Sequence, residues 1–188
     1  MSKPRLFLVA PDGLAGDELT KLVGIAAKAG DCACLLVSDT VDPAAVQAAQ
    51  ALGIAVLLRN AEPRIMHRLI ADGLHLEVAE GLMDLRAALK SESLGVYANV
   101  SRHFAMEAAE AGADYVAFAQ KHQFVGEPII GWWQDVTDVP AVAIDPVEPQ
   151  DLPQLLPQKP DFIRPSDAMW QNADEARRVV VELTAALT

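Results

Sequence analysis

Seven or eight short apolar runs recur along the chain at roughly 20-residue spacing, and most end on a polar or charged residue. Most of them hold several apolar residues in succession without strict alternation. Such runs are typical of parallel strands that are buried on both faces. The pattern therefore predicts about eight strands, which begin at or near Arg5, Ala33, Ile54, Gly73, Leu94, Asp114, Val139 and Asp161.

The segments between these runs are predicted to be helices. Start signals support two of them, because Pro43 follows Asp42 and Asn172 precedes an acidic first turn. The expected helices are Asp17–Lys28, Pro43–Leu52, Pro63–Ala71, Ala79–Leu89, His103–Ala111 and Asn172–Leu187. Alternating strands and helices favour a parallel sheet covered by helices.

The sixth and seventh helical segments are predicted to be irregular. Residues 127–138 form a short segment that Gly131 is expected to break. Residues 148–160 contain four prolines, and each proline lacks the N–H that a helix interior requires. We expect at most a turn or two near Leu152–Leu156.

The fold class predicted from this alternation is a (β/α)8 TIM barrel, forming a single compact domain over residues 1–188. Eight units would average about 23 residues each, so the loops must be short for this fold. An open, doubly wound sheet is the alternative architecture. It is disfavoured because the loop after the first strand reads PDGLAGDE and lacks the G-x-G-x-x-G pattern.

The charge balance argues against nucleic acid and anionic membranes as partners. The formal net charge is −11 and the isoelectric point is about 4.7, whereas phosphate backbones require a basic surface. The first apolar run is too short for a signal peptide or a membrane span. We therefore expect a cytoplasmic protein.

The two cysteines, Cys32 and Cys34, lie two residues apart in one predicted strand. Alternation along a strand would place both side chains on the same face. Neighbours in this arrangement cannot easily close a disulfide, and no metal-binding spacing is present. Buried, reduced thiols are expected.

In a TIM barrel the active site lies at the carboxyl ends of the strands. The polar residues at these ends are Asp12, Ser38, Asp39, Arg59, Asn60, Glu62, Glu77, Glu80, Asn99, Arg102, His103, Gln120, Lys121, His122, Asp145, Arg164 and Ser166. Ordinary loop polarity is one explanation for this ring. Glu77 and Glu80 lie one helical turn apart, so they could share a divalent cation or simply stabilise a helix start.

Three features of the ring and its surroundings carry a more specific interpretation. His75 alternates with two leucines, so it faces away from them, as either a core residue or a functional one. Ser166 follows Arg164 after the last strand, where a hydroxyl, backbone N–H groups and an arginine can together hold a phosphate. The pair Trp132-Trp133 could contribute to a homo-oligomer contact, a pocket wall or, most commonly, the core.

Two segments resemble the thiamine phosphate synthases and their TenI-type thiazole tautomerase relatives. The string RNAEPRIMHRLIADGLHLE, residues 59–77, is similar to a family segment that runs IND, a helix, and GADGVHLGQED. The string LGVYANVSRHFAMEAAEAGADYVAFA, residues 94–119, is similar to the next segment, which runs GVSxH, a helix, and GADYVGLGP. The resemblance extends over nearly the whole chain and implies a barrel fold.

The resemblance also implies a reaction, in which the synthases join an aminopyrimidine pyrophosphate to a thiazole phosphate with Mg²⁺. Asn60 matches the asparagine of IND, Glu80 falls at the second metal aspartate, and Ser166 matches a phosphate-loop residue. Lys121 or His122 could substitute by position for the lysine of the sixth strand. Other positions depart from the family pattern: the second strand reads CLLVSD without basic residues, Ala61 replaces the first metal aspartate, and Asp145-Pro146 replaces two phosphate-binding glycines.

Three functions are therefore open. The first is a divergent member that binds a small-molecule ligand, with a phosphorylated compound as one option. Its candidate binding residues are Asn60, His75, Asn99, Arg164 and Ser166, with Lys121 and His122 as candidate catalytic groups. The second is an active synthase that uses Lys121 as a cation and Glu80 for Mg²⁺. The third is a tautomerase-like isomerase with His122 as general acid or base.

Overall fold

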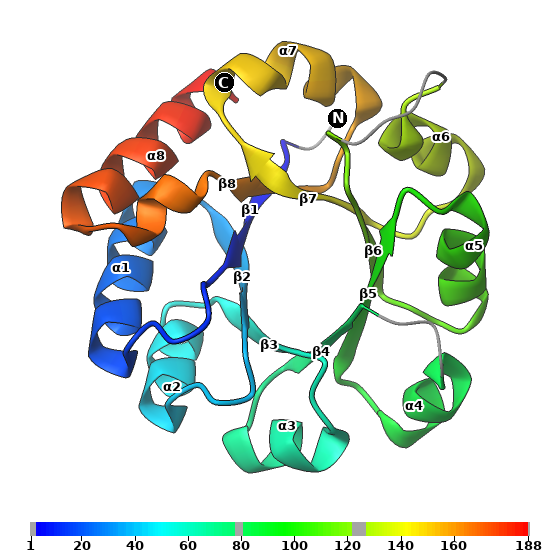
Figure 1. Ribbon diagram of the computed structural model, residues 1–188, viewed down its shortest axis with the longest axis horizontal. Helices are drawn as coiled ribbons and strands as arrows, with labels where there is room; N and C mark the ends of the chain where they lie inside the picture. The colour runs from blue at the N-terminus through cyan, green and yellow to red at the C-terminus, as the bar shows by residue number, and fades with distance from the viewer. Residues whose placement is uncertain (1–2, 78–80, 122–126, 188) are drawn as a thin grey trace.

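The protein is a closed barrel of eight parallel strands surrounded by helices, seen in a computed structural model (Figure 1). The structure describes residues 3–77, 81–121 and 127–187. The strands are β1 (Arg5–Val9), β2 (Cys32–Val37), β3 (Ala55–Arg59), β4 (Gly73–Leu76), β5 (Ser93–Asn99), β6 (Tyr115–Phe118), β7 (Ala141–Val147) and β8 (Phe162–Pro165). Each pairs with its neighbours in chain order, and β8 pairs with β1. The predicted TIM barrel is confirmed, and the open sheet is excluded.

Helices cover the outside of this ring (Figure 1). They are α1 (Gly16–Ala29), α2 (Pro43–Ala51), α3 (Pro63–Leu69), α4 (Leu82–Ala88), α5 (Arg102–Glu110), α6 (Ile129–Val136), α7 (Leu152–Leu155) and α8 (Ala173–Ala186). Asp42 and Asn172 cap α2 and α8 through their side chains, as the sequence signals indicate. Within the described part of the chain, no helix is both long enough and apolar enough to cross a bilayer.

The sixth and seventh segments differ from each other. The proline-rich seventh is broken into a 3-10 turn at Pro149–Asp151, the single-turn α7, and a second 3-10 turn at Leu156–Gln158, as predicted. The sixth is short, but Gly131 lies inside α6 without breaking it. An isolated glycine lowers helix stability by only about 1 kcal/mol, and the buried Ile130 and Trp133 anchor this helix to the core.

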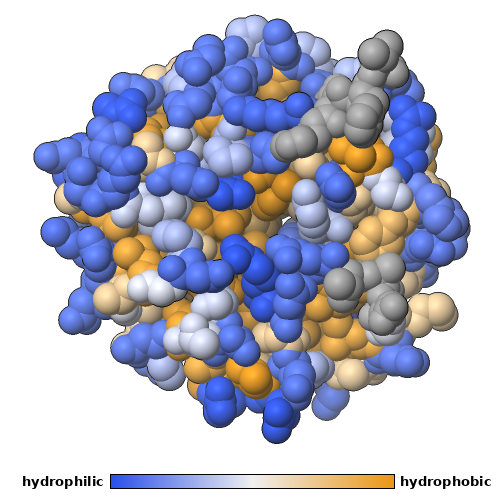
Figure 2. Space-filling model, viewed as in Figure 1, coloured by the Kyte–Doolittle hydropathy of each residue, from blue (hydrophilic) through white to orange (hydrophobic). Residues whose placement is uncertain are grey.

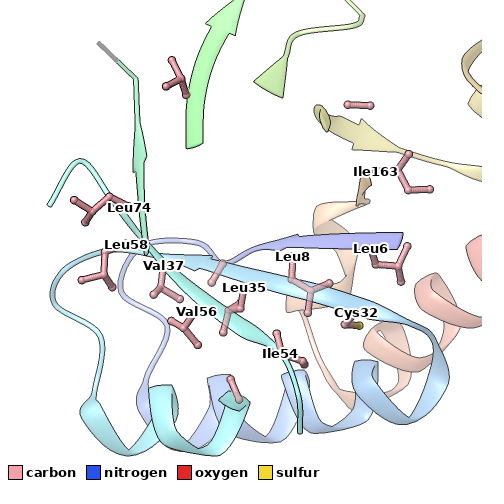
Figure 3. Close-up of a cluster of buried hydrophobic side chains, with 14 of the residues drawn as sticks. Leu6, Leu8, Cys32, Leu35, Val37, Ile54, Val56, Leu58, Leu74 and Ile163 are labelled. Atoms are coloured by element: carbon pink, nitrogen blue, oxygen red, sulfur yellow. The ribbon is translucent and has the colours of Figure 1, made fainter. Parts of the chain in front are cut away.

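Strand alternation divides the buried side chains into two layers. The outer layer joins the barrel to the helices, and Figure 3 shows part of it, with Leu35, Val56 and Leu58 among the labelled side chains. The inner layer fills the barrel itself and includes Phe7 and Tyr115. Trp133 belongs to the outer layer, where its Nε1 donates to the Val139 carbonyl at 2.7 Å.

The expectation that Cys32 and Cys34 share a face is wrong. Cys32 lies in the outer layer (Figure 3), whereas Cys34 lies in the inner one. The cause is an irregularity in the pairing of β1 with β2, where successive residues Leu6 and Phe7 pair with Cys32 and Cys34. Both thiols are free and buried, and burial raises the pKa of Cys32 to about 12, so this thiol stays protonated at neutral pH.

A hydrogen bond across three strands organises the inner layer. His75 on β4 is in register with Gly95 on β5, and Gly95 is in register with Tyr115 on β6. The Tyr115 ring passes over Gly95, so its hydroxyl lies 2.8 Å from Nδ1 of His75. A Cβ atom on Gly95 would lie 1.9 Å from Cζ of Tyr115. Glycine is therefore required here for the tyrosine to reach the histidine.

We predict that Gly95→Ala destabilises the protein by about 2–3 kcal/mol, because the added methyl group forces Tyr115 out of its packed position. Urea unfolding measures the change. The matched control is Gly24→Ala inside α1, where a Cβ would meet nothing within 4 Å. The control should keep or slightly raise stability, since alanine favours helices. Equal stability of Gly95→Ala and wild type would contradict the account.

The stability of the barrel should also fall in mild acid because of His75. Burial, together with the positive charge of Arg59, lowers the pKa of His75 from 6.5 to about 3. The unfolded chain therefore binds more protons than the folded chain between these values, and stability is lost as pH falls below about 6.5. The His75 contribution between pH 7 and pH 5 is on the order of 2 kcal/mol.

Urea titrations at the two pH values test this expectation with His75→Gln, which does not titrate and can still bond Tyr115. The variant should lose less stability than wild type on acidification. His103→Gln is the control, because His103 is exposed on α5 and should leave the wild-type pH dependence intact. An identical loss in wild type and His75→Gln would refute the assignment.

Candidate functional site

Polar side chains meet above the inner layer, at the carboxyl ends of β1, β3, β4 and β8. In the view down the barrel, hydrophilic residues gather across the middle of the ring (Figure 2). These ends enclose a pocket of about 440 Å³. Its lining residues are Val9, Ala10, Pro11, Asp12, Arg59, Glu77, Arg164, Asp167 and Trp170. We call it the mouth pocket.

Arg59 reaches the mouth pocket from the last residue of β3. It is in register with His75, so it lies directly beside the buried histidine of the inner layer. Its Nη1 lies 3.5 Å from Asp12 and its Nε lies 3.8 Å from Glu77. These are ion-pair separations, and the second exceeds hydrogen-bond length. Among the described residues, the buried Nε has no hydrogen-bond partner.

Arg164 enters the same pocket from β8. Its Nη1 donates to the Ile144 carbonyl at 3.2 Å, and its Nη2 donates to both carboxylate oxygens of Asp167 at 2.7 and 2.9 Å. Its Nε is also buried and has no partner within the described residues. Two guanidinium groups from distant parts of the chain thus share one pocket with an unsatisfied donor each.

Asn60 and Glu77 form a reciprocal pair at the rim. The Asn60 side chain accepts from the backbone N–H of Glu77 at 2.9 Å and donates to its carboxylate at 3.1 Å. The backbone of Asn60 has a φ of 48°, a left-handed conformation that asparagine tolerates better than most residues. The pair fixes the Glu77 carboxylate next to Arg59.

His75 and Asn99 occupy different depths of the barrel. His75 is 1% exposed and lies beneath the mouth pocket, bonded to Tyr115. Asn99 is exposed at the end of β5, where its side chain accepts from the Tyr97 hydroxyl at 3.4 Å. The ligand-binding role expected for each stays a prediction.

Lys121 lies in a separate pocket under the seventh segment. Its Nζ pairs with Asp151 at 2.7 Å, and its backbone N–H donates to the Asp145 carboxylate. This second pocket, of about 370 Å³, is lined mainly by glutamines and shares no lining residue with the mouth pocket. Lys121 therefore lines a different pocket from Arg59 and Arg164.

Ser166 is buried at the N-terminus of the 3-10 turn Asp167–Trp170. Its hydroxyl accepts from the Ala168 N–H at 3.5 Å, which is the limit of a hydrogen bond. The serine is next to the mouth pocket along the chain, because Arg164 and Asp167 both line the pocket. Its phosphate-binding role stays a prediction.

Two candidates remain, Glu80 as a metal ligand and His122 as a catalytic residue, and both lie outside the described residues. Within the described ranges, no three histidine, cysteine or carboxylate side chains gather in a way that could hold a metal ion.

The sequence distinguished Arg164 from the other polar strand ends, and it distinguished Glu77 only as a candidate cation ligand with Glu80. Arg59 and Asp12 were among the strand ends without a further interpretation, and Trp170 was not predicted as a site residue. The available signal was alternation along β3: Leu57 belongs to the inner layer, so Arg59, two residues on, faces the same way.

Comparisons with known proteins agree with this architecture. Thiamine-phosphate synthase of Rhodospirillum centenum is 30% identical over 190 residues, which cover 92% of each chain. The enzyme of the same name from Erythrobacter litoralis is 39% identical over 121 residues, which cover 58% of this chain and 57% of the relative. No protein-family model matches the sequence.

Among solved structures, thiamine phosphate pyrophosphorylase from Pyrococcus furiosus has a TM-score of 0.79 over 98% of this chain and 96% of that chain. Its sequence identity of 15% supports the fold alone. The predicted family rests instead on the similarity to the Rhodospirillum centenum sequence. Because that similarity reaches 30% identity and covers 92% of both chains, the chain belongs to the thiamine-phosphate synthase family.

Proposed function

We propose that the mouth pocket binds a small molecule with a phosphate or pyrophosphate group, held between Arg59 and Arg164. The observation that carries this proposal is that Arg59 and Arg164 line one pocket, and that the buried Nε of each lacks a hydrogen-bond partner within the described residues. A buried donor without an acceptor is unfavourable, and arginine is well suited to phosphate oxygens. The apolar wall formed by Pro11 and Trp170 would contact the organic part of the ligand.

The proposal accounts for the missing basic residues of the second strand. In β2 the inward positions are the apolar Cys34 and Leu36, which belong to the inner layer. Positive charge comes instead from Arg59 on β3 and Arg164 on β8. We propose that these two arginines take over the role of the absent pair.

The last residues of β7 support divergence from the family pattern. The Asp145 backbone N–H donates to the Gln120 side chain at 3.0 Å, and Pro146 has no N–H to offer. An anion would therefore find no free backbone donors at these two positions. Ala61, which replaces a metal aspartate in the resemblance, is buried and apolar.

The second candidate function is the synthase reaction itself. The similarity to named synthases across 92% of the chain favours it. In that case Arg59 and Arg164 would bind the pyrophosphate group, and Mg²⁺ would enter with the ligand or through Glu80. A location in the cytoplasm, a single domain over residues 1–188 and a small-molecule partner belong to both candidates as proposals.

We predict that Arg59→Gln and Arg164→Gln each weaken pyrophosphate binding by about tenfold or more, because each removes a charged hydrogen-bond donor. Isothermal titration calorimetry with pyrophosphate gives the dissociation constants. Arg178→Gln is the control, since Arg178 pairs with Glu175 and Glu182 on the outside of the barrel. The double variant Arg59→Gln/Arg164→Gln should bind no pyrophosphate. Wild-type affinity in that variant would reject the proposal.

An activity assay separates the two candidates. The purified protein is incubated with the pyrimidine pyrophosphate, the thiazole phosphate and Mg²⁺, and thiamine phosphate is measured. The divergent binder predicts no product even at high protein concentration. Turnover that disappears in Arg59→Gln would establish the synthase reaction in its place. Isomerisation of a thiazole phosphate that requires His122 would point to the tautomerase alternative.

A further inference from the structure

The pair formed by Asn60 and Glu77 lies beside the unsatisfied guanidinium of Arg59. Oε1 of Glu77 lies 3.8 Å from the Arg59 Nε. We infer that Asn60 is a positioning residue, which holds Glu77 away from Arg59 so that the positive charge of the guanidinium stays available to a bound anion. The inference rests on the proposed function of the mouth pocket.

Glu77 would otherwise compete with the ligand. A carboxylate within ion-pair range of an arginine gains a charge-assisted hydrogen bond when it moves to about 2.8 Å. The required shift is about 1 Å, and Nε has no other partner within the described residues to prevent it. A direct Glu77 contact would neutralise the guanidinium charge that the anion needs.

Asn60 opposes this movement through two bonds to the same residue. Its side-chain oxygen accepts from the Glu77 N–H, and its amide nitrogen donates to Oε2 of Glu77. The other carboxylate oxygen, Oε1, is the one that lies 3.8 Å from the Arg59 Nε. Its own N–H donates to the His75 carbonyl at 2.8 Å. Asn60 is thus tied to the end of β4 from both backbone and side chain. The amide supplies both a donor and an acceptor, whereas an ionised aspartate would supply acceptors alone and could not replace it.

Asn60→Gly tests the inference, because glycine accepts the left-handed backbone and removes both side-chain bonds. We expect pyrophosphate affinity to fall about tenfold in this variant. In a Glu77→Ala background, which lacks the competing carboxylate, Asn60→Gly should cause no further loss. Ile70→Gly is the matched control: Ile70 has a φ of 54° but ends α3, outside the mouth pocket.

A direct role of Asn60 in binding or folding predicts a different result, namely the same loss of affinity with and without Glu77. That result, or wild-type affinity in Asn60→Gly, would overturn the inference. A crystal structure of Asn60→Gly provides a readout that needs no ligand. The Glu77 carboxylate should lie within about 3.2 Å of the Arg59 Nε. An unchanged distance of 3.8 Å overturns the positioning role, whereas absence of pyrophosphate binding in wild type overturns the proposed function alone.

Discussion

The hydrogen bond from Tyr115 across Gly95 to His75 fixes the interior of the barrel on which the mouth pocket rests. It spans β4, β5 and β6, and the Tyr115 ring also lies 5.5 Å from the Phe7 ring of β1. Side chains from opposite sides of the barrel therefore meet in one packed layer, as in other small barrels. The layer requires a glycine on the middle strand and a neutral histidine on β4.

The charged residues of the mouth pocket depend on this inner layer. Arg59 lies in register with His75, and its charge helps to keep the histidine neutral. Because the inner layer fills the barrel, the long side chains of Arg59 and Arg164 extend into the mouth pocket rather than into the barrel. The carboxylates of Asp12 and Glu77 hold Arg59 at ion-pair distance without satisfying its Nε. The pocket thus combines positive donors with restrained negative neighbours.

Much of the fold could be predicted from the sequence, because strands buried on both faces appear as continuous apolar runs and helices between them carry capping signals. The irregularity of the proline-rich seventh segment was also predictable, because proline disrupts a helix locally. That the side chains of Cys32 and Cys34 point to opposite faces of β2 could not be predicted, since it depends on an irregular pairing between β1 and β2. Gly131 shows a similar limit: tertiary packing of Trp133 outweighs its local preference.

The candidate site was predictable only in part. The family could be predicted from ordered strings along β4 to β6, and Arg164 from its place after an apolar run. That Arg59 and Arg164 share a pocket depends on barrel closure between distant strands, and the Asn60–Glu77 pair depends on a left-handed backbone angle. Lys121, chosen by position in the chain, lies in a different pocket with Asp151.

The central claim is that an anion binds between the two guanidinium groups of the mouth pocket. A crystal structure of the wild-type protein grown with pyrophosphate tests it most directly. The account predicts pyrophosphate oxygens within about 3 Å of nitrogen atoms of both Arg59 and Arg164. Pyrophosphate bound instead beside Lys121, or no pyrophosphate at a concentration that saturates binding in solution, would contradict it.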